Sequence, residues 1–304
     1  MRIPARHPFG ESVPEARLRA VASDGTGLHV EVHGQASGDV PTVVLSHGWT
    51  CSASYWAPVI RSLRGELRVI TYDQRGHGAS DPPGPGGCSA EVLASDLEAV
   101  LAAALPEGRR AVLAGHSMGG MTVMAAATRP AVRSRTSAVL LASTGCSQLV
   151  AGSLIFPFPR APRLAETARR LFLGFPGPLG RVTPLSRAML TYIALGPASS
   201  RELAAANAAM IHACHRRSRA AWGRVLADLD LSDSLAHLDV PVRVLVGSAD
   251  RLTPPGQARL LAQRLPRCEG VTELPGVGHM TPVEAPGAVA ALIRKLAAPA
   301  AVAA

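Results

Sequence analysis

The chain has 304 residues, of which 47% are hydrophobic and 17% are charged, a balance that supports a sizeable core and argues against disorder. The formal net charge of +9 comes almost entirely from arginine. Because the arginines are scattered and aromatic residues make up only 4% of the chain, we expect no nucleic acid partner. The charge favours anionic substrates or an acidic carrier protein as a partner.

Cysteine usage and hydropathy limit the class of protein further. The five cysteines are widely spaced and form no CxxC pair, so we expect neither a disulfide framework nor a metal site. The N-terminal residues lack the continuous apolar stretch of a secretory signal, and no run of about twenty apolar residues is uninterrupted. We therefore expect a cytoplasmic protein without stable membrane insertion, of unspecified oligomeric state.

The first half of the chain contains a change in strand pattern. Its predicted strands are 17–23, 28–34, 42–46 and 67–72. The first two alternate between apolar and polar residues and predict a hairpin, whereas the next two are continuous apolar runs typical of a buried parallel sheet. Helices are predicted over 54–63 and after Ser89, which is a candidate N-cap.

The stretch 111–127 contains the sharpest motif of the sequence. An apolar run of strand character breaks at Gly115, and a run compatible with a helix begins after Gly119. The pentapeptide between them, Gly-His-Ser-Met-Gly, matches the G-x-S-x-G pattern of a strained strand-to-helix turn. The glycines remove side chains that would clash, so Ser117 is expected to project above the strand at a helix N-terminus.

The second half contains a long interruption. A strand is predicted over 137–143, but the alternation of strands and helices then stops until residue 238. The later predicted elements are a strand over 241–247, a helix over 256–265, a strand over 270–274 and a helix over 284–296. We therefore predict a mostly parallel, twisted α/β sheet of about eight strands flanked by helices. Its core spans 17–143 and 239–297, and 144–238 forms an inserted helical lid.

Three polar residues follow the predicted ends of parallel strands, where open α/β sheets bind ligands. They are Ser117, Asp250 and His279, in this chain order. A serine hydroxyl needs an adjacent base, and the base needs a carboxylate to fix its tautomer. We predict these three as the catalytic residues. The rival acids Asp228, Asp230, Asp233 and Asp239 lie in the lid or before a strand.

Acyl transfer also requires donors for an oxyanion. The backbone N–H of Met118, directly after the nucleophile, is one predicted donor. The other is the N–H of Trp49, in the loop after the strand 42–46, where Gly48 permits a close approach. His47 is interpreted as a residue that orients this loop.

These motifs together resemble the α/β-hydrolase family, of the lid-bearing serine esterase type. The matching segments are SHGW (46–49), DQRGHGAS (73–80), GHSMGG (115–120), GSAD (247–250) and GVGHM (276–280). The resemblance implies a structural role for Asp73, Arg75 and His77, which belong to a loop-structuring motif. It also implies that Glu284 and Pro286 help to start the last helix.

The leading hypothesis is hydrolysis of a carboxylic ester or thioester with an apolar acyl or alcohol portion, through an acyl-enzyme on Ser117 and without a cofactor or metal. Carbon–carbon hydrolases, cofactor-free haloperoxidases (perhydrolases) and lyases use the same triad and stay open as alternatives. Dehalogenases and epoxide hydrolases of this fold use a carboxylate nucleophile, which Ser117 argues against. A ligand receptor on the same fold is the alternative outside enzymes.

The lid is expected to select the substrate, because it supplies apolar residues for a pocket. The candidates are Leu154, Ile155, Phe156, Phe158, Leu171, Phe172, Leu173, Phe175, Met189, Leu190, Tyr192, Ile193, Met210 and Ile211. Each could equally belong to the core of the lid. His212 and His215 are interpreted as helix-surface residues, and Cys51 and Cys146 as packing residues.

Overall fold

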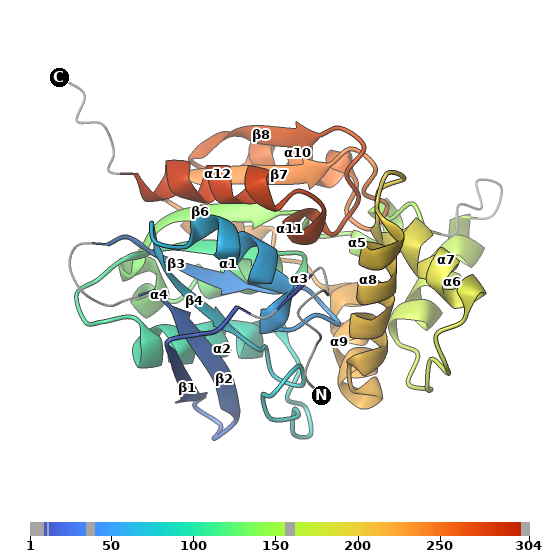
Figure 1. Ribbon diagram of the computed structural model, residues 1–304, viewed down its shortest axis with the longest axis horizontal. Coiled ribbons are helices and arrows are strands. Elements are labelled where there is room, and N and C mark those ends of the chain that lie inside the picture. The colour runs from blue at the N-terminus through green and yellow to red at the C-terminus, as the bar shows by residue number, and fades with distance from the viewer. Residues whose placement is uncertain (1–8, 11, 35–39, 156–161, 299–304) are drawn as a thin grey trace.

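The protein is built on one eight-stranded sheet with the strand order β1-β2-β4-β3-β5-β6-β7-β8 (Figure 1). The computed structural model describes residues 9–10, 12–34, 40–155 and 162–298. The strands are β1 (Ala16–Val21), β2 (Gly27–His33), β3 (Thr42–Ser46), β4 (Arg68–Tyr72), β5 (Ala111–His116), β6 (Thr136–Ala142), β7 (Val242–Gly247) and β8 (Cys268–Leu274). β1 and β2 form the predicted antiparallel hairpin, β2 pairs antiparallel with β4, and all other pairs are parallel. The predicted mostly parallel α/β sheet is confirmed.

Helices cover both faces of the sheet. One face packs against α1 (Ala57–Leu63) and α12 (Pro286–Ala297), and the other against α2 (Ala90–Ala104), α3 (Met118–Ala126) and α10 (Pro255–Arg264). The central strand β5 serves both layers, since Val112 lies in one buried cluster and Leu113 in the other. This double burial explains why β3 to β7 are continuous apolar runs in the sequence.

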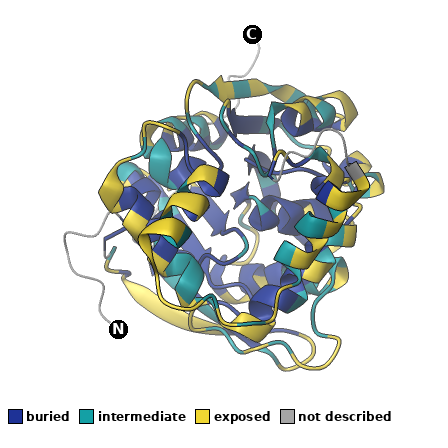
Figure 2. Cartoon of the chain, turned by 90° about the vertical axis from the view of Figure 1, so that its right-hand side faces the viewer, coloured by how far each residue is buried: buried dark blue, intermediate teal, exposed yellow. Residues whose placement is uncertain are grey.

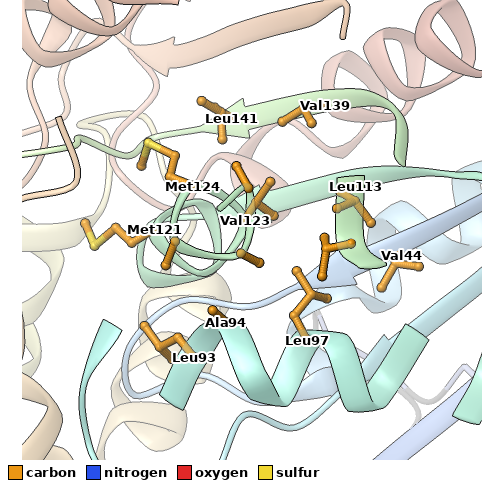
Figure 3. Close-up of a cluster of buried hydrophobic side chains, with 14 of the residues drawn as sticks. Val44, Leu93, Ala94, Leu97, Leu113, Met121, Val123, Met124, Val139 and Leu141 are labelled. Atoms are coloured by element: carbon orange, nitrogen blue, oxygen red, sulfur yellow. The ribbon is translucent and has the colours of Figure 1, made fainter. Parts of the chain in front are cut away.

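The core beneath the serine motif consists of side chains from α2, α3 and the central strands. Figure 3 shows Leu93 and Leu97 of α2 facing the helix α3, with Leu113 of β5 beside them. The helix α3 is buried along its whole length. Such complete burial holds the start of α3, and with it the residue before the helix, in a fixed position.

Several element ends differ from the prediction. The helix expected over 54–63 is a 3-10 turn, η1 (Ala53–Trp56), followed by α1. The last helix begins at Pro286 rather than residue 284, after the short α11 (Thr281–Glu284), because a proline disfavours helical backbone in the residue before it. A short helix that was not predicted, α4 (Pro130–Ser134), connects α3 to β6.

A helical insertion lies between β6 and β7, beside the carboxyl ends of the strands (Figure 1). It contains α5 (Leu149–Gly152), α6 (Pro162–Leu173), α7 (Pro184–Ala194), α8 (Arg201–Ala213), α9 (Arg216–Asp228) and the 3-10 turn η2 (Asp233–His237). Thr183 and Ser200 cap α7 and α8 through their hydroxyls. The insertion agrees with the predicted lid, while the limits 144–238 stay a prediction.

The insertion is less buried than the sheet. Figure 2 shows dark blue strands inside the molecule and yellow outer faces on the surrounding helices. Within the insertion, α7 packs with α8 and α6 packs with α9, and α5 contacts both α6 and α9. The contact between α6 and α9 needs Gly223, since a Cβ there would lie 2.0 Å from the carbonyl oxygen of Leu173. No helix within the described ranges is long and apolar enough to cross a membrane.

Candidate active site

Ser117 occupies a strained turn between β5 and α3. Its backbone has φ 52° and ψ −120°, a conformation that L-residues rarely adopt and that costs about 1–3 kcal/mol. A Cβ on Gly115 would lie 2.3 Å from the carbonyl oxygen of Gly119, and one on Gly119 would lie 2.0 Å from that of Ser46. The glycine spacing of the motif therefore has the steric cause that the sequence indicated.

His279 and Asp250 form a buried pair. The Nδ1 atom of His279 lies 2.9 Å from Oδ2 and 3.1 Å from Oδ1 of Asp250. The carboxylate also accepts bonds of 2.9 Å from the N–H groups of Leu252 and Thr253 and from the Thr253 hydroxyl. A carboxylate at Nδ1 keeps the proton on that nitrogen and leaves Nε2 free to act as a base.

Thr253 is a site residue that the sequence analysis missed. Its hydroxyl donates to Asp250 and lies 3.2 Å from Nδ1 of His279. The sequence signal for Thr253 is the turn after Asp250, because a short polar side chain three residues after an aspartate can close such a turn. The rival acid Asp228 pairs instead with Arg170, at 2.5 Å.

The insertion holds the backbone of the histidine loop. The N–H groups of His279 and Met280 both donate to the carbonyl oxygen of Ala194, at 2.9 and 3.2 Å. The carbonyl oxygen of His279 accepts a bond of 2.8 Å from Nε2 of His116, the residue before the serine. The histidine is thus anchored both to the end of α7 and to the turn that carries Ser117.

Glu284 reinforces this anchor. Its carboxylate accepts from the N–H groups of Gly278 and Met280, both at 3.1 Å, and from the Gly196 N–H at 2.6 Å in the insertion. Its expected role at the start of the last helix is wrong, because Glu284 ends α11 and its acceptor groups bridge two loops. Pro286 does occupy the first turn of that helix.

The two predicted oxyanion donors flank the serine turn. Neither the backbone N–H of Trp49 nor that of Met118 donates to a residue within the described ranges. A Cβ on Gly48 would lie 2.8 Å from Nδ1 of His116 and 3.2 Å from the Ser117 Cβ, so the loop after β3 runs directly against the serine. Their role as donors stays a prediction that this placement supports.

His47 orients the same loop, as interpreted from the sequence. Its Nε2 accepts a bond of 3.0 Å from the Gln74 N–H, and its Nδ1 lies 2.8 Å from the Gly48 carbonyl oxygen. Full burial lowers the pKa of His47 to about 4. His47 is therefore a neutral structural residue rather than a base.

The segment 73–80 connects loops, as the resemblance implied. Asp73 accepts from the N–H groups of Ala53 and Ala79, at 2.6 and 2.8 Å. Arg75 is 1% exposed and donates to Asp96 and Asp24, each at 2.7 Å. His77 accepts a bond of 3.2 Å from the Thr50 N–H. These contacts hold the segment 73–80 in a fixed position below the site.

A cavity of about 470 Å³ lies between the site and the insertion. Ser117, His279 and Trp49 line it together with apolar lid residues. The predicted residues that line it are Ile155, Leu171, Phe172, Leu173, Phe175, Met189, Leu190, Ile193 and Ile211. Leu154 and Tyr192 are instead about half exposed and Met210 packs against the core, while Phe156 and Phe158 lie outside the described residues.

The remaining histidines and cysteines differ in their surroundings. His215 is exposed as predicted, but His212 also lines the cavity, with Nδ1 3.2 Å from the Gly180 carbonyl oxygen. Cys51 and Cys146 are buried, and burial raises the pKa of the Cys51 thiol. Over the described part of the chain, no three His, Cys, Asp or Glu side chains are grouped to hold a metal ion.

Fold and sequence comparisons agree on the class of protein. A profile of the alpha/beta hydrolase family matches residues 43–292. The pimeloyl-[acyl-carrier protein] methyl ester esterase of Aromatoleum aromaticum is 31% identical over 74% of this chain and 86% of its own length. The chain therefore belongs to the alpha/beta hydrolase family.

Two solved structures are similar over nearly the whole chain. The enol-lactonase of Burkholderia xenovorans LB400 is 27% identical, with a TM-score of 0.71 over 92% of this chain and 99% of its own. A thermophilic esterase of Thermogutta terrifontis is 26% identical, with a TM-score of 0.71 over 93% and 100%. The RutD protein of Rhizobium rhizogenes, a proposed carbamate hydrolase, is 42% identical, but the chain spans only 35% of its length in that match.

Proposed function

We propose that the protein is a serine hydrolase that cleaves a carboxylic ester with an apolar acyl or alcohol portion. The observation that carries the proposal is the shared cavity of Ser117 and His279, the latter bonded to Asp250 at 2.9 Å. The lining by apolar lid side chains supports an apolar substrate.

In the proposed reaction, Nε2 of His279 takes the proton of the Ser117 hydroxyl as its oxygen attacks the ester carbonyl. The negative charge on the carbonyl oxygen is stabilised by the backbone N–H groups of Trp49 and Met118. The protonated His279 then donates its proton to the leaving alcohol, which leaves an acyl-enzyme. Water activated by the same imidazole releases the acid and restores the serine.

The relatives support ester chemistry. One is named as a methyl ester esterase, one solved structure as an esterase and one as an enol-lactonase, whose substrate class is an internal ester. A thioester substrate needs the same groups and belongs to the same proposal. The predicted acidic carrier partner stays a prediction, supported by the carrier in the name of the methyl ester esterase and by a lid rich in arginine.

The test combines labelling with turnover. The protein is treated with a fluorophosphonate, the modified residue is mapped by mass spectrometry, and kcat/KM is measured on p-nitrophenyl esters of increasing acyl length. We expect labelling at Ser117 and clear turnover, with an optimum length that reports the size of the cavity.

Two variants separate the outcomes. Ser117→Ala should lose both labelling and turnover, while Ser153→Ala, which removes another hydroxyl from the cavity lining, should keep the label on Ser117. Labelling without ester turnover would favour a perhydrolase, a lyase, a carbon–carbon hydrolase or a receptor. Labelling elsewhere would contradict the assignment of the nucleophile.

A further inference from the structure

A buried arginine without a carboxylate partner is part of the mostly apolar cavity lining. Arg219 of α9 is only 5% exposed and belongs to the cavity lining. One of its terminal nitrogens donates to the carbonyl oxygens of Gly177 and Phe175, at 2.6 and 3.4 Å. These carbonyls orient the guanidinium group through dipoles but leave its positive charge uncompensated.

No carboxylate within the described part of the chain pairs with Arg219. From Leu149 to His237 the insertion carries eleven arginines against five acidic residues. Asp230 and Asp233 are exposed at its end. Glu166 and Asp228 both pair with Arg170, and Glu202 is exposed at the start of α8. Burial without a counter-ion lowers the pKa of Arg219, which agrees with a missing partner.

Arg219 is also tied to the loop that approaches the serine. The indole N–H of Trp49 donates to the backbone carbonyl of Arg219, at 2.9 Å. Trp49 and Arg219 line the same cavity as Ser117. A ligand that reacts at Ser117 can therefore extend within this cavity toward the Arg219 guanidinium group.

We infer that Arg219 binds a carboxylate carried by the substrate at a distance from the ester. The preferred substrate would be a monoester of a dicarboxylic acid, with an apolar chain between the ester and the free carboxylate. The Nε and the second terminal nitrogen of Arg219 donate to no described residue, so they are available to such a group. A guanidinium fork matches the two oxygens of a carboxylate.

This inference rests on the proposed esterase function and narrows its substrate class. The p-nitrophenyl monoesters of adipic, suberic and sebacic acid are compared with the p-nitrophenyl esters of the monocarboxylic acids of equal chain length. At the best length, we expect kcat/KM for the charged ester to exceed that of the neutral ester about tenfold or more. This ratio should fall about 10- to 100-fold in Arg219→Met, the range of a charge-assisted hydrogen bond.

Matched variants test whether the effect belongs to this residue. Arg219→Lys keeps the charge and should retain a preference for the charged ester that Arg219→Met lacks. Arg217→Met removes an exposed arginine from the same helix and should leave the ratio unchanged. Equal ratios in wild type and Arg219→Met would overturn the inference. A fall of this ratio in Arg169→Met but not in Arg219→Met would also overturn the inference, since Arg169 is the other arginine of the cavity lining.

A binding experiment separates this inference from the proposed chemistry. Calorimetry on Ser117→Ala should show that monomethyl suberate binds at least tenfold more tightly than methyl octanoate. The added Arg219→Met change should abolish this difference in affinity. Binding that depends on Arg219 in a protein without esterase activity would support the anion site and reject only the reaction. Esterase activity without this dependence would reject the anion site alone.

Discussion

The loops at the strand ends and the helical insertion differ in how their buried charged groups are paired. Below the site, Arg75 is 1% exposed and donates to two carboxylates, and Asp250 accepts four hydrogen bonds. In the insertion, Arg219 is buried with carbonyl oxygens as its only described acceptors, while apolar side chains such as Leu185, 81% exposed, face outward.

This difference assigns separate tasks to the two regions. The predicted catalytic groups must be held within fractions of an ångström, which agrees with the many hydrogen bonds that hold these loops. A region that selects a ligand can leave groups unsatisfied until the ligand arrives. We therefore expect substitutions in the loops to affect turnover or stability, and substitutions in the insertion to affect which ester is cleaved.

The largest expected effect is on turnover and comes from Asp250→Asn. The amide can present its oxygen or its NH₂ group to His279, and the wrong histidine tautomer no longer accepts the serine proton. We expect kcat to fall about 10⁴-fold with little change in unfolding free energy. Steady-state kinetics on the best p-nitrophenyl ester and urea unfolding measure the two quantities.

Asp239→Asn is the matched control for the acid. Asp239 is exposed and lies before β7, so its replacement should leave kcat within about twofold. Near-normal activity of Asp250→Asn, or a severe loss in Asp239→Asn, would mean that the wrong carboxylate has been assigned.

Arg75→Met should destabilise the protein more than any exposed arginine substitution. It leaves Asp96, which is 2% exposed, without its cationic partner, and breaking such a buried pair costs about 3–5 kcal/mol. Arg181→Met, an exposed arginine of the insertion, should change the unfolding free energy by less than about 0.5 kcal/mol. Urea unfolding compares the two variants, and equal losses would remove the contrast between the regions.

The sequence predicted the loops better than the insertion for a physical reason. Ser117, Asp250 and His279 follow continuous apolar strands, and parallel strands bring their carboxyl ends to one edge whatever the details of packing. Glycine positions such as Gly115 and Gly119 are dictated by backbone contacts at short range, so they are visible as a motif.

The insertion has no such constraint. Its helices are amphipathic, and they pack partly against one another and partly against the core, as α9 does through Trp222 and Leu226. The pattern could indicate that Leu171 and Tyr192 are apolar residues on helices, but not that the first lines the cavity while the second contacts Arg251 at the surface. Likewise, the sequence alone could not separate the buried Arg219 from its exposed neighbour Arg217.

The buried histidines of the loops predict a pH dependence of stability. Burial lowers the pKa of His47 to about 4 and that of His77 to about 3, and each ring uses Nε2 to accept a backbone N–H. Since the unfolded residues titrate near 6.5, the unfolded state binds more protons as the pH falls below that value. Stability is therefore full above about pH 6.5 and decreases toward pH 4.

Urea unfolding at pH 8 and pH 5 measures this loss. At pH 5 each of the two histidines should have lost about 2 kcal/mol of its stabilising contribution, because the folded rings are still neutral. In His77→Gln the difference between the two pH values should be smaller by about 2 kcal/mol, while His47 and the buried His116, whose pKa burial also lowers, keep their contributions. An unchanged difference in that variant would show that other groups control the titration.

The smallest expected effect is on selectivity and comes from Leu171→Ala in the insertion. Leu171 is 70% exposed yet lines the cavity, whereas Leu185 is 81% exposed and lies outside it. Loss of an apolar contact should lower kcat/KM for a long-chain p-nitrophenyl ester about tenfold and leave the acetate ester within about twofold. Leu185→Ala should change neither ester, and both variants should keep the unfolding free energy within about 1 kcal/mol. If both esters decreased equally in Leu171→Ala, the residue would act on the catalytic groups rather than on the acyl chain, and the division of tasks between loops and insertion would fail.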